Sequence, residues 1–371
     1  MSAAHEADGV VFRAAGPADD ADLRAALREN ALPSWATMSL RREPSFFAGE
    51  GLMGESAAVI AREAAAPHRP VGMYTCAFAP VHVDGAPETV GYLGGLRVNA
   101  PYRRRPRVVR NGFASIPVVV GNRGGVPFWF TSVSRENSAA VRLLEAGLPG
   151  MPTYRRAGLY ETWTMATSRG RGAGVLRRAR REDAAALAAF HNARAARRQF
   201  SPVLSADWLL SLDGSKGLTL GDFWLAEDAS GLRACLAVWD QRAFKQTVAA
   251  AYRFPLSLLR APYNLWAAAS RRAPLPRVGR PLEHVFLAFA AFAGDDDGFA
   301  LSIVREALAR AAEKGASSAV LGLAAGDPLG AAIRARLSPH RYASLIETVT
   351  WPGEPAAALD GRPVSPEAAL L

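Results

Sequence analysis

Hydrophobic and polar positions along the first part of the chain follow the two periods of regular secondary structure. Apolar, β-branched or aromatic runs predict strands at 11–13, 59–62, 71–78, 90–98 and 128–133. Leu23 and Leu27, four residues apart, predict a helix over 17–29 that Asp19 or Asp20 would cap. A further helix is expected over 138–146, followed by Gly147 as a C-terminal cap.

The pattern starts again after a polar, glycine-rich stretch at 167–174. A short apolar opening at 175–179 repeats the one at 11–15, and at the same offset Asp183 corresponds to Asp19 and Leu187 to Leu23. Further strands are expected at 223–227, 233–240, 247–252, 284–292, 319–323 and 344–351, and helices at 299–312 and 328–336.

This order predicts an α+β protein of two tandem domains, each a mixed, mostly antiparallel sheet flanked by helices. The N-terminal domain would comprise residues 1–166, the linker 167–174, and the C-terminal domain 175–371. Prolines in an insertion near 253–281 exclude one continuous helix there. That insertion is expected to pack between the domains or to cover a pocket.

Composition narrows the class of protein. Hydrophobic residues make up 50% of the 371 and charged residues 21%, which is typical of a globular protein. No apolar stretch is long enough to span a membrane, and two distant cysteines, Cys76 and Cys235, indicate a reducing cytoplasm. The net charge of +10 comes from arginine far more than lysine, a bias that suggests a GC-rich bacterial genome and weakens an interpretation based on nucleic acid.

The segment 91–110 carries the clearest chemical signal. An apolar strand leads through Asn99-Ala100-Pro101 into a basic loop and then a helix start. The N-terminus of a helix presents free N–H groups and a positive dipole end. Arginines grip phosphate through two donors at once, and the loop contains four of them: Arg103, Arg104, Arg105 and Arg107.

This segment resembles the acyl-CoA-binding motif of the GNAT N-acyltransferase superfamily. The resemblance implies that the loop from Arg103 to Val108 binds the pyrophosphate of coenzyme A. Leu96, Arg97 and Val98 would then offer backbone groups to the pantetheine arm. A second motif from Asn137 to Leu148 resembles the Asn-led helix of the same family, and Asn137 joins the expected cofactor residues.

Several positions depart from the family pattern. Arg104 and Pro106 replace loop glycines, and Val108 replaces a small residue. Leu144 stands where the family frequently has its general acid, a tyrosine. Tyr154 and Glu136 are the leading candidates for general acid and base, with Tyr160 and Glu88 as substitutes, although a packing role for Tyr154 also fits the sequence.

The corresponding loop of the second domain, Asp295 to Asp297 and its neighbours, is acidic and would repel a pyrophosphate. We therefore expect no coenzyme A there. Its carboxylates form a helix-capping turn or, less simply, ligate a cation; the six histidines show no metal-binding spacing, so no metal site is predicted. His284 faces a pocket or is structural, and the polar run 239–246 is a hairpin connection or a turn facing the substrate.

The sequence thus predicts an N-acyltransferase that moves an acyl group, acetyl being favoured, from acyl-CoA to a small-molecule or peptide amine. The alternatives are a tRNA-dependent aminoacyltransferase, which the positive charge permits, and a non-catalytic, degenerate ligand-binding or scaffold protein. No membrane partner is expected.

Overall fold

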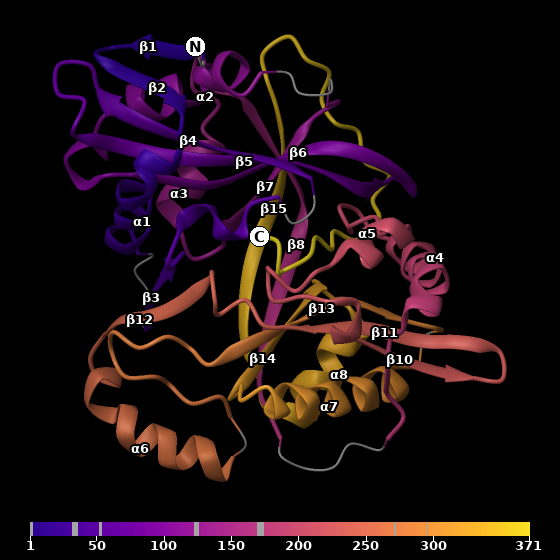
Figure 1. The fold of residues 1–371 in the computed structure, drawn as a ribbon. Coiled ribbons are helices and arrows are strands. Elements are labelled where there is room, and N and C mark those ends of the chain that lie inside the picture. The colour runs from indigo at the N-terminus through magenta and orange to yellow at the C-terminus, as the bar shows by residue number, and fades with distance from the viewer. Residues whose placement is uncertain are drawn as a thin grey trace.

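The computed structural model describes residues 3–31, 36–51, 54–121, 126–168, 174–270, 272–294 and 296–371. One sheet of thirteen strands runs through the whole molecule, in the order β1-β2-β4-β5-β6-β7-β15-β8-β14-β13-β11-β10-β9. Helices cover both of its faces (Figure 1). Most of the predicted linker 167–174 lies outside the described residues.

Residues up to 166, here called the N-terminal half, contribute eight strands and three α-helices within the described ranges. They are β1 Ala4–Ala7, β2 Val10–Ala14, α1 Asp20–Glu29, β3 Ala36–Arg41, β4 Glu55–Glu63, β5 Pro70–Val83, β6 Ala86–Val98, α2 Pro106–Val119, β7 Trp129–Ser134, α3 Ser138–Leu144 and β8 Thr153–Ala166.

Residues from 175 onward, the C-terminal half, repeat this order with an insertion. They form β9 Arg177–Arg178, α4 Ala184–Ala195, α5 Ala206–Ser211, β10 Phe223–Asp228, β11 Gly231–Trp239, β12 Gln246–Tyr252, α6 Leu256–Ala269, β13 His284–Phe292, α7 Asp297–Glu313, β14 Ser318–Ala324, α8 Pro328–Leu337 and β15 His340–Thr350. The predicted α+β fold of two similar units is confirmed.

The internal repeat is visible in individual side chains. Arg13 pairs with Asp19 at 2.7 Å in the N-terminal half, and Arg177 pairs with Asp183 at 2.7 Å in the C-terminal half. In both halves the same carboxylate also accepts a backbone N–H three residues earlier. Leu23 and Leu187 are fully buried on the helices that follow.

Asp19 is the N-cap residue of α1, as expected, but its side chain makes no capping hydrogen bond to that helix. The Asp19 carboxylate closes the preceding turn at Gly16 and pairs with arginines, whereas the Asp20 carboxylate accepts hydrogen bonds from Ser45 and the Phe46 amide. Pro117 lies inside α2 and does not end it, because the helix continues to Val119. Pro117 falls in the last turn, where the missing N–H removes a single helical hydrogen bond.

Alternate residues along each strand serve cores on opposite faces of the sheet. On β4, Val59 and Ala61 pack toward α2, while Ala58 and Ile60 pack toward α1. On β11, residues 234, 236 and 238 join the core beneath α7 and α8, and residues 235, 237 and 239 join the core beneath α4 and α5. Both halves therefore have helices on each face.

The two halves exchange strands at the centre of the sheet. β15, from the C-terminal half, lies between β7 and β8 of the N-terminal half, antiparallel to both. β8 in turn pairs with β14 of the C-terminal half. A second link, the two-stranded sheet of β3 and β12, also joins the halves (Figure 1).

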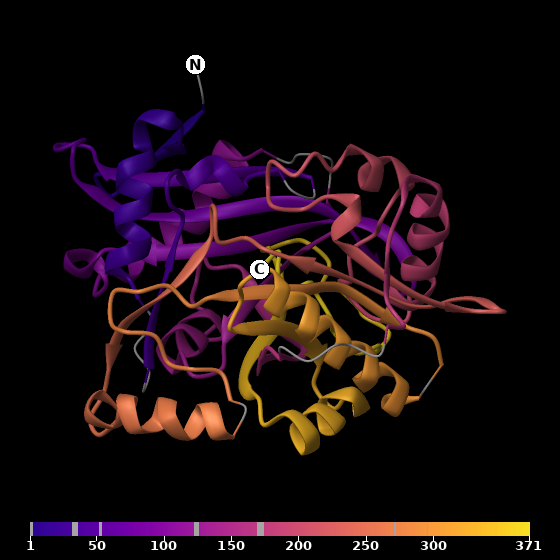
Figure 2. The ribbon, with the colours of Figure 1, turned by 60° about the horizontal axis from the view of Figure 1, so that its bottom comes forward.

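The proline-rich insertion contains one α-helix, α6, followed from residue 272 by chain without regular secondary structure and a turn at 278–279. Pro262 lies inside that helix, so the prolines exclude a helix over the whole segment but not across this position. α6 lies at the edge of the molecule in both views (Figures 1 and 2). Within the described residues, no helix combines the length and apolar character needed to cross a membrane.

Candidate acyl-CoA and acceptor site

The parallel strands β6 and β7 are paired over only part of their length and then separate. They are paired from Gly91 with Trp129 to Leu93 with Thr131, after which β6 stays with β5 and β7 with β15. A bulge on β6 adds one residue opposite Met73 to Thr75, and Gly95 there has a φ of 62°. The separation opens a cavity of about 180 Å³, here called cavity A, between the strands and helices α2 and α3.

Six of the predicted site residues line cavity A. They are Leu96, Arg97, Val98, Val108, Asn137 and Tyr154. Asn137 is the N-cap of α3, and its side-chain oxygen accepts the Ala140 N–H at 3.3 Å. The Arg97 guanidinium donates to the Leu96 carbonyl at 2.9 Å, and burial lowers its pKa. Strand residues and helix cap thus meet around one space, as a bound chain-like ligand would require.

The four loop arginines gather at the N-terminus of α2, all exposed to solvent. Arg103 is engaged on both sides, because it donates to the Val98 carbonyl at 3.1 Å and to the Asn30 side chain at 2.6 Å. Arg105 lies over the Tyr102 ring at 5.2 Å. In the described part of the chain none of the four, Arg104 and Arg107 included, forms an ion pair. The cluster therefore offers positive charge to a polyanion at the end of cavity A.

Tyr154 lies in cavity A with its ring edge-on to Phe113. Burial and the nearby carboxyl group of Glu347 raise the pKa of Tyr154 well above its usual value, so the phenol keeps its proton near neutral pH. Glu136 and Glu88 are exposed and line none of the described cavities. Tyr160 is buried along a different cavity, together with His191 of the C-terminal half.

A second cavity of about 190 Å³, cavity B, adjoins the first. Cavities A and B share four lining residues: Met73, Thr75, Gly94 and Gly95. A Cβ atom at Gly94 would come within 2.8 Å of the Tyr92 ring, and one at Gly95 within 2.8 Å of the Thr75 hydroxyl. Larger residues at these two positions would therefore collide with Tyr92 or Thr75, and the glycines leave the boundary between the cavities without side chains there.

Both halves build cavity B, and its titratable groups come from both. Arg42, Glu50 and Tyr92 belong to the N-terminal half, and Lys245 and Glu367 to the C-terminal half. Burial raises the pKa of Tyr92 to about 12 and also raises the pKa of Glu50.

Lys245 is one of two groups in cavity B that can exchange a proton near neutral pH. Burial, reinforced by the positive charge of Arg42, lowers its pKa to about 7. Its Nζ donates to the backbone oxygens of Leu371 at 2.6 Å and Ala369 at 3.3 Å. A neutral amine has two N–H groups for these two acceptors and one lone pair left for a proton.

Glu367, in the segment after β15, is the acidic group of cavity B that titrates in the same pH range as Lys245. Burial raises its pKa to about 7, although its carboxylate accepts the Phe289 and Ala369 amides at 2.7 and 3.1 Å. Both groups therefore sit near the midpoint of their titration, a property that clusters at functional sites.

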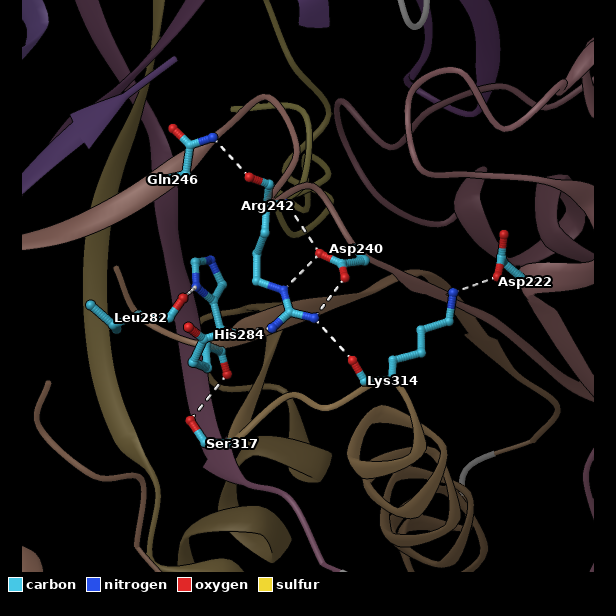
Figure 3. Close-up of polar contacts among 9 residues, drawn as sticks. Asp222, Asp240, Arg242, Gln246, Leu282, His284, Lys314 and Ser317 are labelled. Atoms are coloured by element: carbon cyan, nitrogen blue, oxygen red, sulfur yellow. Dashed lines mark hydrogen bonds and ion pairs between the residues drawn. The ribbon is translucent and has the colours of Figure 1, made fainter. Parts of the chain in front are cut away.

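The turn between β11 and β12 holds Lys245 in place. Arg242 donates twice to the Asp240 carboxylate, at 2.9 and 2.7 Å, and once to the Lys314 carbonyl at 2.9 Å (Figure 3). Gln246 donates to the Arg242 carbonyl at 2.8 Å, so both sides of Lys245 are fixed. The run 239–246 is thus a braced connection between strands, and it also faces cavity B through Gln241, Phe244 and Lys245.

Sequence reasoning singled out the run 239–246 as a hairpin connection or a turn facing the substrate, but it gave Lys245 no role and did not identify Glu367. Lys245 is one of only three lysines in a chain with 44 basic residues, and a lysine in the connection between two apolar strands, β11 and β12, was the available signal. Glu367 carried no such signal, because its burial depends on where the segment after β15 packs. Its contact with Phe289 joins residues far apart in the sequence.

The corresponding region of the C-terminal half differs in charge. β13 and β14 pair in parallel from His284 to Phe286, and α7 follows β13 as α2 follows β6. Asp296 caps α7 by accepting the Phe299 N–H at 3.0 Å, as the capping alternative predicted; Asp295 lies outside the described residues. No group of three potential metal ligands exists among the described residues. His284 is buried, and its Nδ1 lies 3.2 Å from the Leu282 carbonyl oxygen (Figure 3).

Solved structures share this fold over nearly the whole chain. Saccharomyces cerevisiae N-myristoyltransferase with bound myristoyl-CoA superposes with a TM-score of 0.63 at 10% identity, covering 97% of this chain and 90% of that one. A GCN5-related N-acetyltransferase from Sphaerobacter thermophilus gives 0.54 at 13% identity, covering 94% and 98%. No family model and no curated protein matches the sequence. The chain has the GNAT-superfamily fold, as its motifs predicted.

Proposed function

We propose that this protein is an N-acyltransferase that moves an acyl group from acyl-CoA to the amine of a small molecule or peptide. The observation that carries the proposal is the junction of the two cavities at the β6 bulge. Cavity A, with the arginine cluster at its end, would hold the coenzyme A thioester, and cavity B would hold the amine. Because both cavities are lined by Gly94 and Gly95, a thioester in one and an amine in the other would lie close together.

The fold relatives support the donor class. The N-myristoyltransferase structures contain myristoyl-CoA, and the bacterial relative is named an N-acetyltransferase. Acetyl is the acyl group that the sequence favours. The proposed compartment remains the cytoplasm, with Cys76 and Cys235 both buried as free thiols.

In the proposed reaction, the amine nitrogen attacks the thioester carbonyl carbon and the carbon–sulfur bond then breaks. We propose that Lys245, in its neutral form, is the general base that accepts the proton lost by the amine. This replaces Glu136 as the proposed base, because Glu136 lines neither cavity. Tyr154 remains the proposed acid for the departing thiolate, and Tyr92, whose ring lies against Gly94, is its competitor. Phenylalanine substitutions at the two positions would separate them, since only the true donor should change kcat.

Calorimetric titration with acetyl-CoA, myristoyl-CoA and dephospho-coenzyme A tests the donor site. One site per chain in the micromolar range, weakened without the 3′-phosphate, is expected. Thiol release from acyl-CoA with a panel of amines and amino-terminal peptides then tests transfer. Binding without thiol release would favour the degenerate ligand-binding alternative, and no binding of any coenzyme A species would refute the donor assignment.

A further inference from the structure

Helix α6 presents its apolar side to solvent. Leu258 and Leu265 expose 73% and 77% of their surface and Trp266 exposes 50%, while Phe254, just before the helix, exposes 75%. Positions 254, 258, 262, 265 and 269 follow helical spacing and are all apolar and exposed. Six of the eleven exposed large hydrophobic side chains of the described chain fall between residues 254 and 278.

The inner side of α6 is polar, the reverse of an ordinary surface helix. The Asn264 amide exchanges two hydrogen bonds of 2.9 Å with the Leu275 backbone, and Arg260 donates to the same carbonyl at 3.3 Å. The Tyr263 hydroxyl lies 2.8 Å from the Nε2 atom of His340 on β15. These contacts hold the helix with its apolar side toward solvent. The exposure of that side is therefore a property of the folded structure.

The charge of the segment 253–281 is entirely positive. It contains six arginines and no acidic residue. Arg253, Arg277 and Arg280 of this segment are exposed, Arg253 directly before Phe254 in the chain, and the Arg272 guanidinium lies over the Trp266 ring at 4.8 Å. An exposed apolar face with a tryptophan, in a segment whose only charges are arginines, matches the chemistry of the boundary between headgroups and acyl chains in an anionic bilayer.

We propose that α6 and the flanking segment 253–281 dock on the surface of an anionic lipid membrane. The helix lies in the plane of the interface, with Phe254, Leu258 and Leu265 inserted among the acyl chains and the arginines on the headgroups. Its 14 residues measure about 21 Å, short of the roughly 30 Å hydrocarbon core, so it lies on the bilayer and does not span it. A symmetric contact with a second copy is disfavoured because it would bring the same arginines together.

Vesicle co-sedimentation of the full-length protein tests the docking. Binding is expected to vesicles of equal parts phosphatidylcholine and phosphatidylglycerol and to fall at high salt, because the arginine contribution is screened. Binding of the protein to vesicles of pure phosphatidylcholine should be weaker by about tenfold or more. The double variant Leu258→Ser with Leu265→Ser should lose about tenfold or more in partitioning to the mixed vesicles.

The matched control is Leu148→Ser with Val175→Ser, since both side chains are exposed apolar residues outside the segment. It should partition like the unmodified protein. Absence of binding to the mixed vesicles would overturn the proposal, and so would equal binding by the α6 variant. Sedimentation velocity adds a third outcome: an oligomer of the unmodified protein that the α6 variant converts to a monomer would assign the face to a second copy instead.

Discussion

The two halves of this chain place opposite charges at equivalent points of one fold. In the N-terminal half, β6 leads through four arginines into α2. In the C-terminal half, β13 leads through Asp296 and Asp297 into α7. Both loops end at a helix N-terminus with free N–H groups, yet only the first adds side chains that attract a polyanion.

The comparison shows that a helix N-terminus does not by itself make an anion site, because the side chains around it decide which charge it attracts. In the C-terminal half the helix satisfies its own N-terminus, because Asp296 accepts the Phe299 N–H. In the N-terminal half no side chain caps α2. We infer that the C-terminal half contributes to the acceptor side of the reaction, through Lys245 and Glu367, and not to the binding of the donor.

The largest expected effect tests that division of labour. Lys245→Met should lower kcat by about 10²–10⁴-fold while leaving acyl-CoA affinity unchanged, because the base serves only the amine. In the unmodified protein, activity should rise with pH through about 7, where Lys245 loses its proton, and the variant should lose this limb. Steady-state kinetics across pH measures both.

Lys314→Met is the matched control, since that lysine pairs with Asp222 and lines none of the described cavities. Arg42 and Glu367 also act on Lys245, so Glu367→Gln should shift the midpoint downward by removing a negative charge. A pH profile unchanged by Lys245→Met would contradict the assignment of the base.

The second-largest expected effect comes from reversing the charge of the arginine loop at the N-terminus of α2. Arg105→Glu with Arg107→Glu should weaken acetyl-CoA binding by about a hundredfold, because two phosphate contacts become repulsive. These two are preferred to Arg103, which also braces Asn30. Calorimetry measures the change.

The mirror variant in the C-terminal half, Asp296→Asn with Asp297→Asn, should leave donor affinity unchanged, since asparagine also caps a helix. A loss of donor affinity in this variant would mean that the acidic loop takes part in donor binding after all.

A smaller effect compares the repeated ion pairs. Asp19→Asn should cost about 3 kcal/mol of unfolding free energy and Asp183→Asn about 1 kcal/mol. Asp19 is almost fully buried and serves Arg62 as well as Arg13, whereas Asp183 has Arg177. Chemical denaturation measures the difference.

The sign with pH follows from the same contacts. The arginines and the Gly16 amide hold the pKa of Asp19 well below its ordinary value, against the opposing effect of burial. Its contribution is complete above the pKa of the unfolded carboxyl and is lost as the pH falls below it. Equal costs for the two variants at neutral pH would show that the halves are equally dependent on this motif.

The smallest effect concerns the caps of α3 and α8. Asn137→Ala and Asp327→Ala should each cost about 1 kcal/mol, because both side chains accept backbone N–H groups. Only Asn137→Ala should also weaken acyl-CoA, since Asn137 lines cavity A. Thermal unfolding and calorimetry on both variants separate stability from binding, and an equal loss of affinity would remove Asn137 from the donor site.

Local pattern was enough to predict most elements of the fold. The apolar runs at 59–62, 71–78 and 90–98 became β4, β5 and β6, and the repeat of Asp19 at Asp183 indicated the duplication. β3 was not predicted as a strand, so its pairing with β12 was not predicted either. The two strands lie about two hundred residues apart, and pairing over such a distance depends on how the halves pack.

The candidate site divides in the same way. The strand residues and Asn137 were predictable because one contiguous motif carries them. Glu136 was the leading candidate for the base, but its side chain is exposed to solvent and lines none of the described cavities. Cavity B could not be predicted, because its groups come from β6, from the turn before β12 and from the segment after β15.

The strand exchange also sets an order of events during synthesis. β7 and β8 have no partner on their facing edges until residues 340–350 emerge from the ribosome, because β15 lies between them. Until then one edge of β7 is unpaired, and before β14 is made both edges of β8 are unpaired. Such edges invite pairing with other chains, so rapid completion of the chain should limit aggregation. For the same reason, a gene cut between the halves should yield two fragments that are soluble only when produced together.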